Sequence, residues 1–280
     1  MLIRYRTITA IINIHRRMAK CIHGDCLEEM KSLPDKSIDL FVCDLPYGCL
    51  KARNGGAYRK GGGSYGAAGC EWDVKIDLVA LWREIERLCK NDHTPVIMFC
   101  NAKLGAELIQ SKPDWFRYDL IWNKEIGVSF LLANKQPMRS HELIYVFAKK
   151  SAFYKRIDVF KEGMPADIRP NQSRGKSRTN NLIPSAAGMG YTDYAQEENK
   201  RCPLSIIHDR HISKKSHPTG KSITLYKWLI SRYSNEGDTV LDPTAGSFSS
   251  GRAAIELKRS YIGIEKDDKF YNENKIDAPA

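Results

Sequence analysis

The residues most suited to chemistry in this chain are Asp44-Leu45-Pro46-Tyr47, which follow the largely apolar run 38–43. A short apolar run that ends at a turn predicts a buried strand, so Asp44 should stand at the carboxyl end of a central parallel strand, where open α/β sheets bind ligands. Pro46 fixes its own φ and favours an extended Leu45, which holds the Leu45 carbonyl beside the Asp44 carboxylate. Two acceptors that face one point, with the Tyr47 ring next to them, suit a flat group carrying an amino nitrogen. Taken alone, the tetrapeptide also fits a strand that ends in a structural proline turn.

A second candidate site stands near the carboxyl end of the chain. Residues 239–242 predict a strand, which is followed by a tight turn at Pro243, Thr244, Ala245, Gly246 and Ser247. Glu265 closes the next predicted strand about 20 residues after Gly246, where nucleotide-binding βαβ units place an acid that accepts from ribose hydroxyls. The turn has one glycine instead of Gly-x-Gly-x-x-Gly, so it is not built to hold a pyrophosphate. The pattern predicts a nucleoside cofactor without a diphosphate, and S-adenosylmethionine (SAM) is such a molecule.

Together these stretches resemble the beta class of amino-DNA methyltransferases. Asp44-Leu45-Pro46-Tyr47 is similar to the catalytic Asp-Pro-Pro-Tyr motif of that class, with leucine in place of the first proline. Further stretches match the other motifs of the class in the right order: Gly24-Asp25-Cys26, Trp122-Asn123-Lys124, His217-Pro218-Thr219-Gly220-Lys221, Asp242–Ser247 and Tyr261–Glu265. The resemblance covers about residues 20–271.

The resemblance implies an α/β, Rossmann-like, SAM-dependent methyltransferase fold that is circularly permuted. Its sheet is mostly parallel and twisted, with helices on both faces and an irregular target-recognition insertion. In such a sheet the strand that ends at Glu265 should have a further neighbour, yet the sequence ends at Ala280. We expect the strand predicted at residues 20–23 to supply that neighbour. Asp25 would then lie at its carboxyl end, where it can meet the adenine of the cofactor.

By resemblance, each motif carries a defined role. The residues implied in catalysis are Asp44, Leu45, Pro46 and Tyr47. The residues implied in cofactor binding are Asp25, Cys26, His217, Thr219, Lys221, Asp242, Pro243, Ala245, Gly246, Ser247, Glu265 and Lys266. The His217–Lys221 segment is expected to pack beside the methionine part of SAM.

The expected chemistry is methyl transfer to an exocyclic amine, whose lone pair is delocalised into the base. Asp44 and the Leu45 carbonyl, by accepting from the two amino hydrogens, would favour tetrahedral nitrogen and free that lone pair. SAM supplies an activated methyl group, so the protein mainly positions and neutralises charge, and no metal is needed. The base must be flipped out of the duplex, with Tyr47 stacking on it. Aspartate in the first position resembles the adenine-N6 members, whereas cytosine-N4 members more often carry serine there.

Two basic, poorly apolar segments are candidates for contact with DNA. The glycine-rich segment 54–69 could close over substrate or touch the DNA backbone, or it could be a plain disordered loop. Residues 149–215 lose apolar periodicity and are interpreted as the target-recognition region, with a solvated linker as the alternative. The DNA-binding residues that we expect in and beside these segments are Arg53, Arg59, Lys60, Arg169, Asn171, Arg174, Lys176 and Arg178.

Composition and charge narrow the class of protein and the kind of partner. The chain has 280 residues, a net charge of +11 and a pI near 9.2, which favours a polyanionic partner. No apolar run approaches the roughly 18 residues of a membrane-spanning helix. The eight cysteines include no Cys-x-x-Cys pair, so we expect reduced thiols in a reducing compartment. The family resemblance implies a cytoplasmic protein of a prokaryotic or phage-infected cell. Double-stranded DNA is the expected partner, while a homodimer and a cognate restriction endonuclease stay open.

Four segments are expected along the chain. Residues 1–19 form a basic arm, an extension from an upstream start codon or a transit peptide; 20–148 form the catalytic half, 149–215 the target-recognition region and 216–280 the cofactor-binding half. We also expect Trp72-Asp73 to open a helix. His141 and Glu142 could be catalytic, but we expect a hydrogen-bonded structural pair.

Three departures from the family pattern bear on activity: Leu45, Ser222 after Lys221, and Phe248 with Ser249-Ser250 in place of Gly-Thr-Thr. Phe248 should crowd the cofactor turn. Three alternatives therefore stay open beside adenine-N6 transfer: cytosine-N4 transfer, methylation of RNA or protein, and an inactive DNA-binding relative.

Overall fold

The computed structural model describes residues 19–48, 73–128, 130, 133–160, 200–210 and 220–276. The chain divides into two compact units, Met1–Lys155 with Ser205–Ala280, and Arg156–Leu204. In the described part of the smaller unit, β6 (Val159–Phe160) pairs antiparallel with β7 (Lys200–Arg201). Everything else described below belongs to the larger unit.

The larger unit is built on one eight-stranded sheet with the order β1-β10-β9-β2-β3-β5-β4-β8. Its strands are β1 (Ala19–His23), β2 (Leu40–Cys43), β3 (Val96–Cys100), β4 (Phe116–Val128), β5 (Arg139–Phe147), β8 (Ile206–His208), β9 (Thr239–Asp242) and β10 (Ser260–Glu265). The five strands from β1 to β3 in this order are parallel, β5 runs antiparallel to β3 and β4, and β8 is parallel to β4. The expected α/β fold with a mostly parallel sheet is confirmed.

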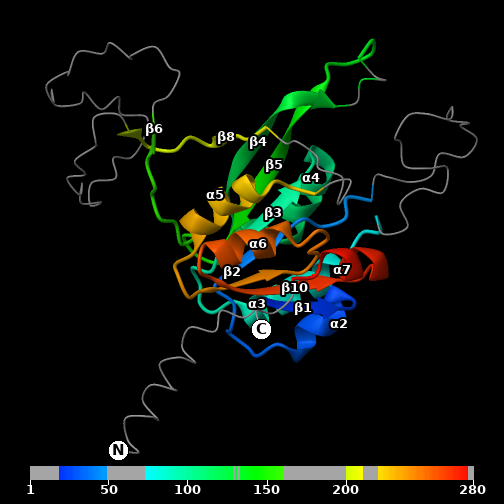
Figure 1. Ribbon diagram of the computed structural model, residues 1–280, viewed down its shortest axis with the longest axis vertical. Helices are drawn as coiled ribbons and strands as arrows, with labels where there is room; N and C mark the ends of the chain where they lie inside the picture. The colour runs from blue at the N-terminus through cyan, green and yellow to red at the C-terminus, as the bar shows by residue number, and fades with distance from the viewer. Residues whose placement is uncertain are drawn as a thin grey trace, which may run out of the picture. The chain divides into compact units, whose positions relative to one another are not determined.

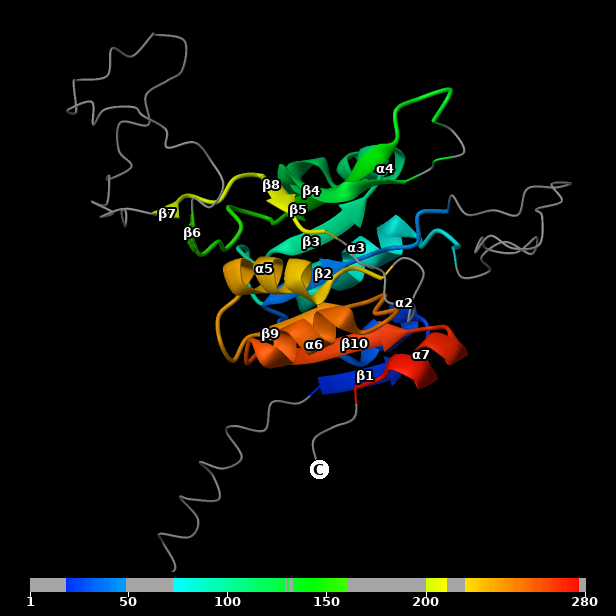
Figure 2. The ribbon, with the colours of Figure 1, turned by 45° about the horizontal axis from the view of Figure 1, so that its top comes forward.

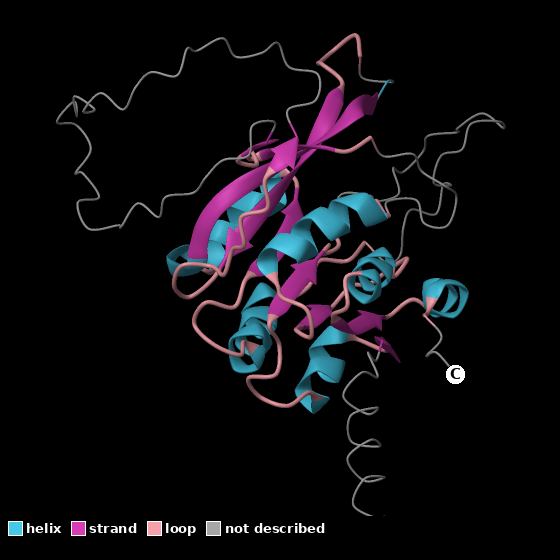
Figure 3. Ribbon diagram, turned by 60° about the vertical axis from the view of Figure 1, so that its left-hand side comes forward, coloured by secondary structure: helices cyan, strands magenta, loops and turns pink. Residues whose placement is uncertain are grey.

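The central strands are apolar along their whole length because both faces of the sheet are covered. Every residue of β2 and β3 is buried, as parallel strands between two helical layers require. One layer contains α2 (Cys26–Glu29), α3 (Leu78–Leu88) and α4 (Ala102–Ser111), with the 3-10 turns Met30–Ser32 and Pro113–Trp115. The other contains α5 (Ile223–Tyr233) and α6 (Ser249–Glu256), which lie in front of the sheet in Figure 2. Figure 3 shows helices on both sides of the strands.

Side-chain caps fix where most of these helices begin. Asp77 caps α3, Asn101 caps α4 and Ser222 caps α5, each by accepting from a backbone amide of the first turn. Asp267 does the same for α7 (Asp268–Asn274). Ser222, one of the departures from the family pattern, therefore has a local structural use.

The two ends of the described chain meet in the sheet, as the permuted order predicted. β1 pairs with β10 in parallel register, from Ala19 opposite Tyr261 to His23 opposite Glu265 (Figure 1). The Gly24 amide continues this ladder by donating to the Glu265 carbonyl at 3.0 Å. Residues 24–25 and Glu265 consequently stand at the same edge of the sheet.

Two expectations about the elements were wrong. Asp73 does not open a helix: α3 begins at Leu78, and the Asp73 carboxylate instead accepts from the Gly48 amide at 2.8 Å. The residues 206–208, which we placed in the irregular target-recognition region, form β8 at the edge of the main sheet beside β4. The pattern missed β8 because three residues are too few to show a period.

Phe248 does not crowd the cofactor turn, contrary to our expectation. It occupies the N-cap position of α6 in the left-handed conformation, with φ 53°, makes no side-chain cap hydrogen bond, and has a fully buried side chain. Its ring packs in the helical layer and meets the Tyr271 ring edge to face, with centroids 6.2 Å apart. A strained backbone at this position is thus combined with a large buried side chain.

This combination predicts an unusual order of stability. Phe248→Ala should lower the free energy of unfolding by about 3–5 kcal/mol, because it leaves a cavity and keeps the strain. Phe248→Gly should be less harmful by about 1 kcal/mol, because glycine adopts positive φ freely. Denaturant unfolding checks both, with Val79→Ala, which changes a side chain that is 80% exposed, as the control. Equal or greater loss in the glycine variant would contradict this account.

Candidate active site

A cavity of about 970 Å³ opens at the carboxyl ends of β2, β9, β10 and β1. Its wall includes Asp44, Leu45, Pro46 and Tyr47 from the first candidate site. The wall also includes these expected cofactor residues: Asp25, Cys26, Lys221, Pro243, Ala245, Gly246, Ser247, Glu265 and Lys266. The structure therefore brings the two candidate sites into one cavity.

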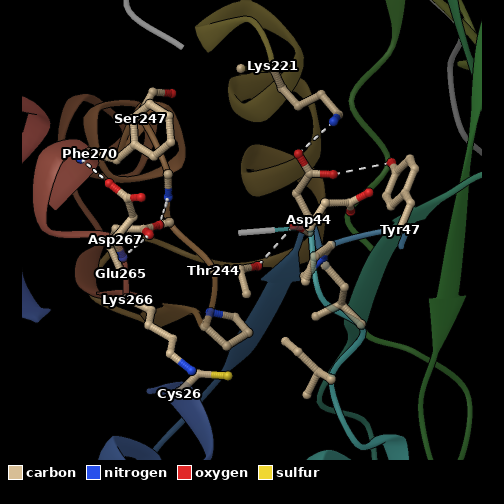
Figure 4. Close-up of a pocket in the computed structure, with 18 of the residues that line it drawn as sticks. Cys26, Asp44, Tyr47, Lys221, Thr244, Ser247, Glu265, Lys266, Asp267 and Phe270 are labelled. Atoms are coloured by element: carbon tan, nitrogen blue, oxygen red, sulfur yellow. Dashed lines mark hydrogen bonds and ion pairs between the residues drawn. The ribbon is translucent and has the colours of Figure 1, made fainter. Parts of the chain in front are cut away.

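Asp44 follows directly on β2 and is held from three directions. Its Oδ1 accepts from the Tyr47 hydroxyl at 3.2 Å, and its Oδ2 accepts from Lys221 Nζ at 2.6 Å (Figure 4). Its backbone carbonyl accepts from the Thr244 hydroxyl at 3.1 Å. Thr244 and Lys221 come from the other end of the sequence, so both halves of the chain fix this carboxylate.

The charges around Asp44 set its ionisation. Burial raises the pKa of Asp44, Lys221 opposes that rise, and Glu142 adds to it, so the pKa lies above its ordinary value. The pKa of Tyr47 is also raised, by burial and then by the Asp44 charge. Tyr47 consequently keeps its proton and acts as a donor to Asp44.

Lys221 lies against Asp44, although the resemblance placed it with the methionine part of the cofactor. Its side chain is only 4% exposed, and Nζ lies 3.3 Å from Glu142 Oε2 as well as 2.6 Å from Asp44 Oδ2. Burial lowers the pKa of Lys221, but the two carboxylates outweigh it, so its pKa is raised and the ammonium form is kept.

The sequence singled out Glu142 but assigned it to a structural pair with His141. That pair is wrong, and the position of Glu142 in the cavity was not predicted. Glu142 lines the cavity and forms ion pairs with Lys124 and Lys221, both outside its own strand. One signal could have found it, because Glu142 and Lys124 are charged residues on predicted neighbouring strands of a buried sheet. Arg139 and Phe270 also line the cavity and were not expected.

At the other end of the cavity, Glu265 is fixed by backbone amides. Its Oε2 accepts from the Gly246 amide and its Oε1 from the Asp267 amide, both at 2.7 Å (Figure 4). Gly246 has φ 50°, which turns its amide towards the carboxylate at little cost for glycine. Burial raises the pKa of Glu265, while the amide bonds from Asp267 and Gly246 favour its charged form.

Asp25 and Lys266 line the cavity next to Glu265. Lys266 Nζ donates to Asp25 Oδ2 at 3.0 Å, and Asp25 Oδ1 caps α2 by accepting from the Leu27 amide at 2.9 Å. Burial raises the pKa of Asp25, but Lys266 and the Leu27 amide outweigh it, so the pKa is lowered. Burial raises the pKa of the Cys26 thiol to about 12, so Cys26 contributes its surface and no thiolate.

Asp242 is a correction to the expected cofactor set, because it does not line the cavity. It is 1% exposed, its Oδ1 accepts from the Thr244 amide at 3.1 Å, and its Oδ2 accepts from the Ser250 hydroxyl. Burial raises its pKa to about 7, although both hydrogen bonds favour the charged form. Asp242 shapes the turn that carries the cavity residues.

Several expected site residues lie outside the described residues. They are Arg53, Arg59, Lys60, Arg169, Asn171, Arg174, Lys176, Arg178, His217 and Thr219. Residues 1–18 of the expected basic arm also lie outside them. Among the residues that are described, no helix has the length and apolar composition needed to cross a membrane.

Sequence comparison matches most of the chain to one protein family. The profile of the N6/N4 methyltransferase family, described as DNA methylase, matches residues 38–275. The type II methyltransferase M.HinfI of Haemophilus influenzae is 27% identical over 273 residues, which cover 92% of this chain and 67% of the relative. The DNA adenine methyltransferase YhdJ of Escherichia coli (strain K12) is 26% identical over 255 residues, which cover 89% and 79% respectively.

Solved structures share the fold. The M1.HpyAVI–SAM complex superposes with a TM-score of 0.54 at 19% identity, covering 92% of this chain and 98% of that one. The cytosine-N4-specific PvuII DNA methyltransferase superposes with a TM-score of 0.57 at 13% identity, covering 94% and 88%. The expected Rossmann-like fold of SAM-dependent DNA methyltransferases is therefore confirmed.

The buried Asp242 predicts a pH-dependent stability. Its folded-state pKa lies above the value of about 3.9 in an unfolded chain, so its stabilising contribution is complete below about pH 4 and is lost as pH rises towards 7. Relative to Asp242→Asn, the wild-type free energy of unfolding should fall by up to about 4 kcal/mol across that range. Urea unfolding at several pH values measures this, with the exposed Glu256→Gln as control. A difference that does not change with pH would show that folding does not raise the pKa of Asp242.

Proposed function

The chain belongs to the N6/N4 DNA methylase family, and we propose that it transfers the methyl group of SAM to N6 of an adenine flipped out of double-stranded DNA. It is a DNA methyltransferase by family; the base, the cofactor and the roles of individual residues are the proposal. One observation carries it: Asp44, directly after β2, and Glu265, at the end of β10, line one cavity.

The cofactor half of the cavity has the groups that SAM requires. Glu265 offers a carboxylate to the ribose hydroxyls, and Asp25 stands next to it for the adenine. Pro243, Ala245, Gly246 and Ser247 provide a turn without a second glycine for a phosphate. The structural neighbour M1.HpyAVI was solved in complex with SAM, which supports the same cofactor here.

The amine half of the cavity is proposed to hold the base. Asp44 and the Leu45 carbonyl accept the two amino hydrogens, which restores the nucleophilic lone pair of the nitrogen and stabilises the positive charge that develops on it. SAM supplies the electrophilic methyl group. As the new C–N bond forms, the C–S bond breaks, and one amino proton then leaves the nitrogen towards Asp44 and solvent. The Tyr47 ring is proposed to stack on the base, and its hydroxyl, which donates to Asp44, supports a role in orienting that carboxylate.

The choice of adenine rests on two supports. Aspartate leads the catalytic motif, and the relative YhdJ is named a DNA adenine methyltransferase. The fold alone does not separate the bases, since the PvuII enzyme is named cytosine-N4-specific. DNA rather than RNA or protein is favoured by the family match.

DNA contact is proposed for the basic residues of the 53–60 and 169–178 segments, with target recognition between 149 and 215. A homodimer, a cognate endonuclease and a cytoplasmic location stay predictions from sequence. Incubating the protein with labelled SAM and genomic DNA, followed by mass spectrometry of the digested DNA, tests the function. Labelled N6-methyladenine is the expected product; labelled N4-methylcytosine, or no label in the DNA, would overturn the proposal.

The proposed role of Asp44 predicts a selective loss. Asp44→Ala, and the isosteric Asp44→Asn, should lower the rate of methyl transfer by at least about 100-fold, because the charge that faces the amine is lost. The dissociation constant for SAM, measured by calorimetry, should stay within about threefold of wild type. Transfer by either variant at the wild-type rate would remove Asp44 from the catalytic role.

Glu265 is expected to act on the cofactor and not on the chemistry. Glu265→Gln should weaken SAM binding by about 10-fold or more, because a hydrogen bond to a charged acceptor is lost. The rate at saturating SAM should change much less. Glu256→Gln, on the outer face of α6 and paired with Lys227, is the matched control. Unchanged SAM affinity in Glu265→Gln would contradict its placement at the ribose.

A further inference from the structure

The catalytic carboxylate stands at the end of a row of alternating charges that the proposed chemistry leaves unused. From Asp44 the row continues to Lys221, then to Glu142, and ends at Lys124. Side-chain exposure in this row is between 4% and 19%, so water screens these charges poorly. Buried ion pairs of this kind are weak stabilisers of a fold, which favours a use in the reaction.

Lys221 occupies the position where a substrate amine is needed. Its ammonium donates to Asp44 Oδ2 at 2.6 Å, which is the distance of a strong charged hydrogen bond. A base amino group that is to be activated by the same carboxylate must compete with this donor. The positive charge also opposes the positive charge that develops on the attacked nitrogen.

Glu142 provides a second carboxylate to which the Lys221 ammonium can donate a hydrogen bond. Its Oε1 is held by Lys124, whereas its buried Oε2 accepts no hydrogen bond from any described residue. Lys221 Nζ already lies 3.3 Å from Oε2, so a shift of roughly half an ångström would give a full charged hydrogen bond. The Phe99 and Tyr47 rings, with centroids 5.1 and 5.9 Å from Nζ, favour a cation along this short path.

We propose that Glu142 is a positioning residue that takes the Lys221 ammonium when the target base enters, and so frees Asp44 Oδ2 for the amino group. Lys124 keeps Glu142 in place by holding its other oxygen. When the Lys221 ammonium is hydrogen-bonded to Glu142, the Glu142 carboxylate balances its positive charge. The negative charge of Asp44 is then available to the amine. This inference rests on the proposed methyl transfer to an amine at Asp44.

The experiment compares turnover, SAM affinity and folding of the full-length protein carrying Glu142→Gln with wild type. The change keeps the shape of the side chain and removes the charge that would attract Lys221. We expect kcat for methyl transfer to fall by about 10-fold or more, with SAM affinity within about threefold. Glu84→Gln is the control, because Glu84 is also a buried glutamate paired with a cation, Arg87, and does not line the cavity.

A second background separates this role from simple support of the fold. The Lys221→Met variant lacks the ammonium that Glu142 is proposed to bind, so Glu142 is only a second negative charge near Asp44. Adding Glu142→Gln to Lys221→Met should therefore leave kcat unchanged or raise it, whereas independent structural losses would multiply. If Glu142→Gln does not fold, Glu142→Asp keeps the charge but withdraws the carboxylate, and it should lower kcat in the same way.

The outcomes distinguish failure of the proposed methyl transfer from failure of the proposed role of Glu142. If wild-type protein transfers no methyl group to DNA, the proposed function fails and this inference fails with it. If wild type is active and Glu142→Gln, or its Asp substitute, turns over within about twofold of it, only the inference is overturned. A loss of turnover that is explained by weaker SAM binding, or that multiplies in the double variant, overturns it as well.

Discussion

The pairing of β2 with β9 is the constraint on which the whole site depends. From β2 the chain continues to β3 on one side of the sheet, and from β9 it continues to β10 on the other. Loops that follow two such strands diverge, and the crevice between them is where open α/β sheets bind ligands. Here the Phe41–Leu241 register places Asp44 beside Thr244, and the hydrogen bond between them joins residues 200 positions apart. The proposed catalytic motif and the proposed cofactor turn share a cavity for this reason.

The same constraint explains why the order of the chain can be permuted without loss of the site. The parallel ladder between β1 and β10 places Asp25 next to Lys266, although they lie at opposite ends of the sequence. What matters physically is which strand ends lie side by side, and not where the chain is cut. A cavity assembled in this way depends on complete strand pairing. The edge strand β1 therefore supports the sheet and also positions Asp25 in the cavity wall.

The sequence was sufficient for the parts of the site that are local. Asp44 and Glu265 could be placed because each directly follows an apolar run, and a strand end needs only neighbouring residues to be recognised. The Asp44–Lys221–Glu142 contacts could not be predicted, since they join three elements far apart in the chain and depend on rotamers. Phe248 and Asp242 were misplaced for a related reason: a motif gives the position of a residue on the turn but not the direction of its side chain. Phe248 has a left-handed backbone and a fully buried side chain, and Asp242 points at Ser250.

In the proposed enzyme, one cavity holds a methyl donor at Glu265 and an extruded base at Asp44. A crystal structure of the protein with S-adenosylhomocysteine and duplex DNA would test this arrangement. We expect ribose hydroxyls within hydrogen-bond distance of Glu265, and the amino nitrogen of an extruded adenine about 2.7–3.2 Å from an Asp44 carboxylate oxygen. A nucleoside bound away from Glu265, or a base whose amino group does not reach Asp44, would contradict it.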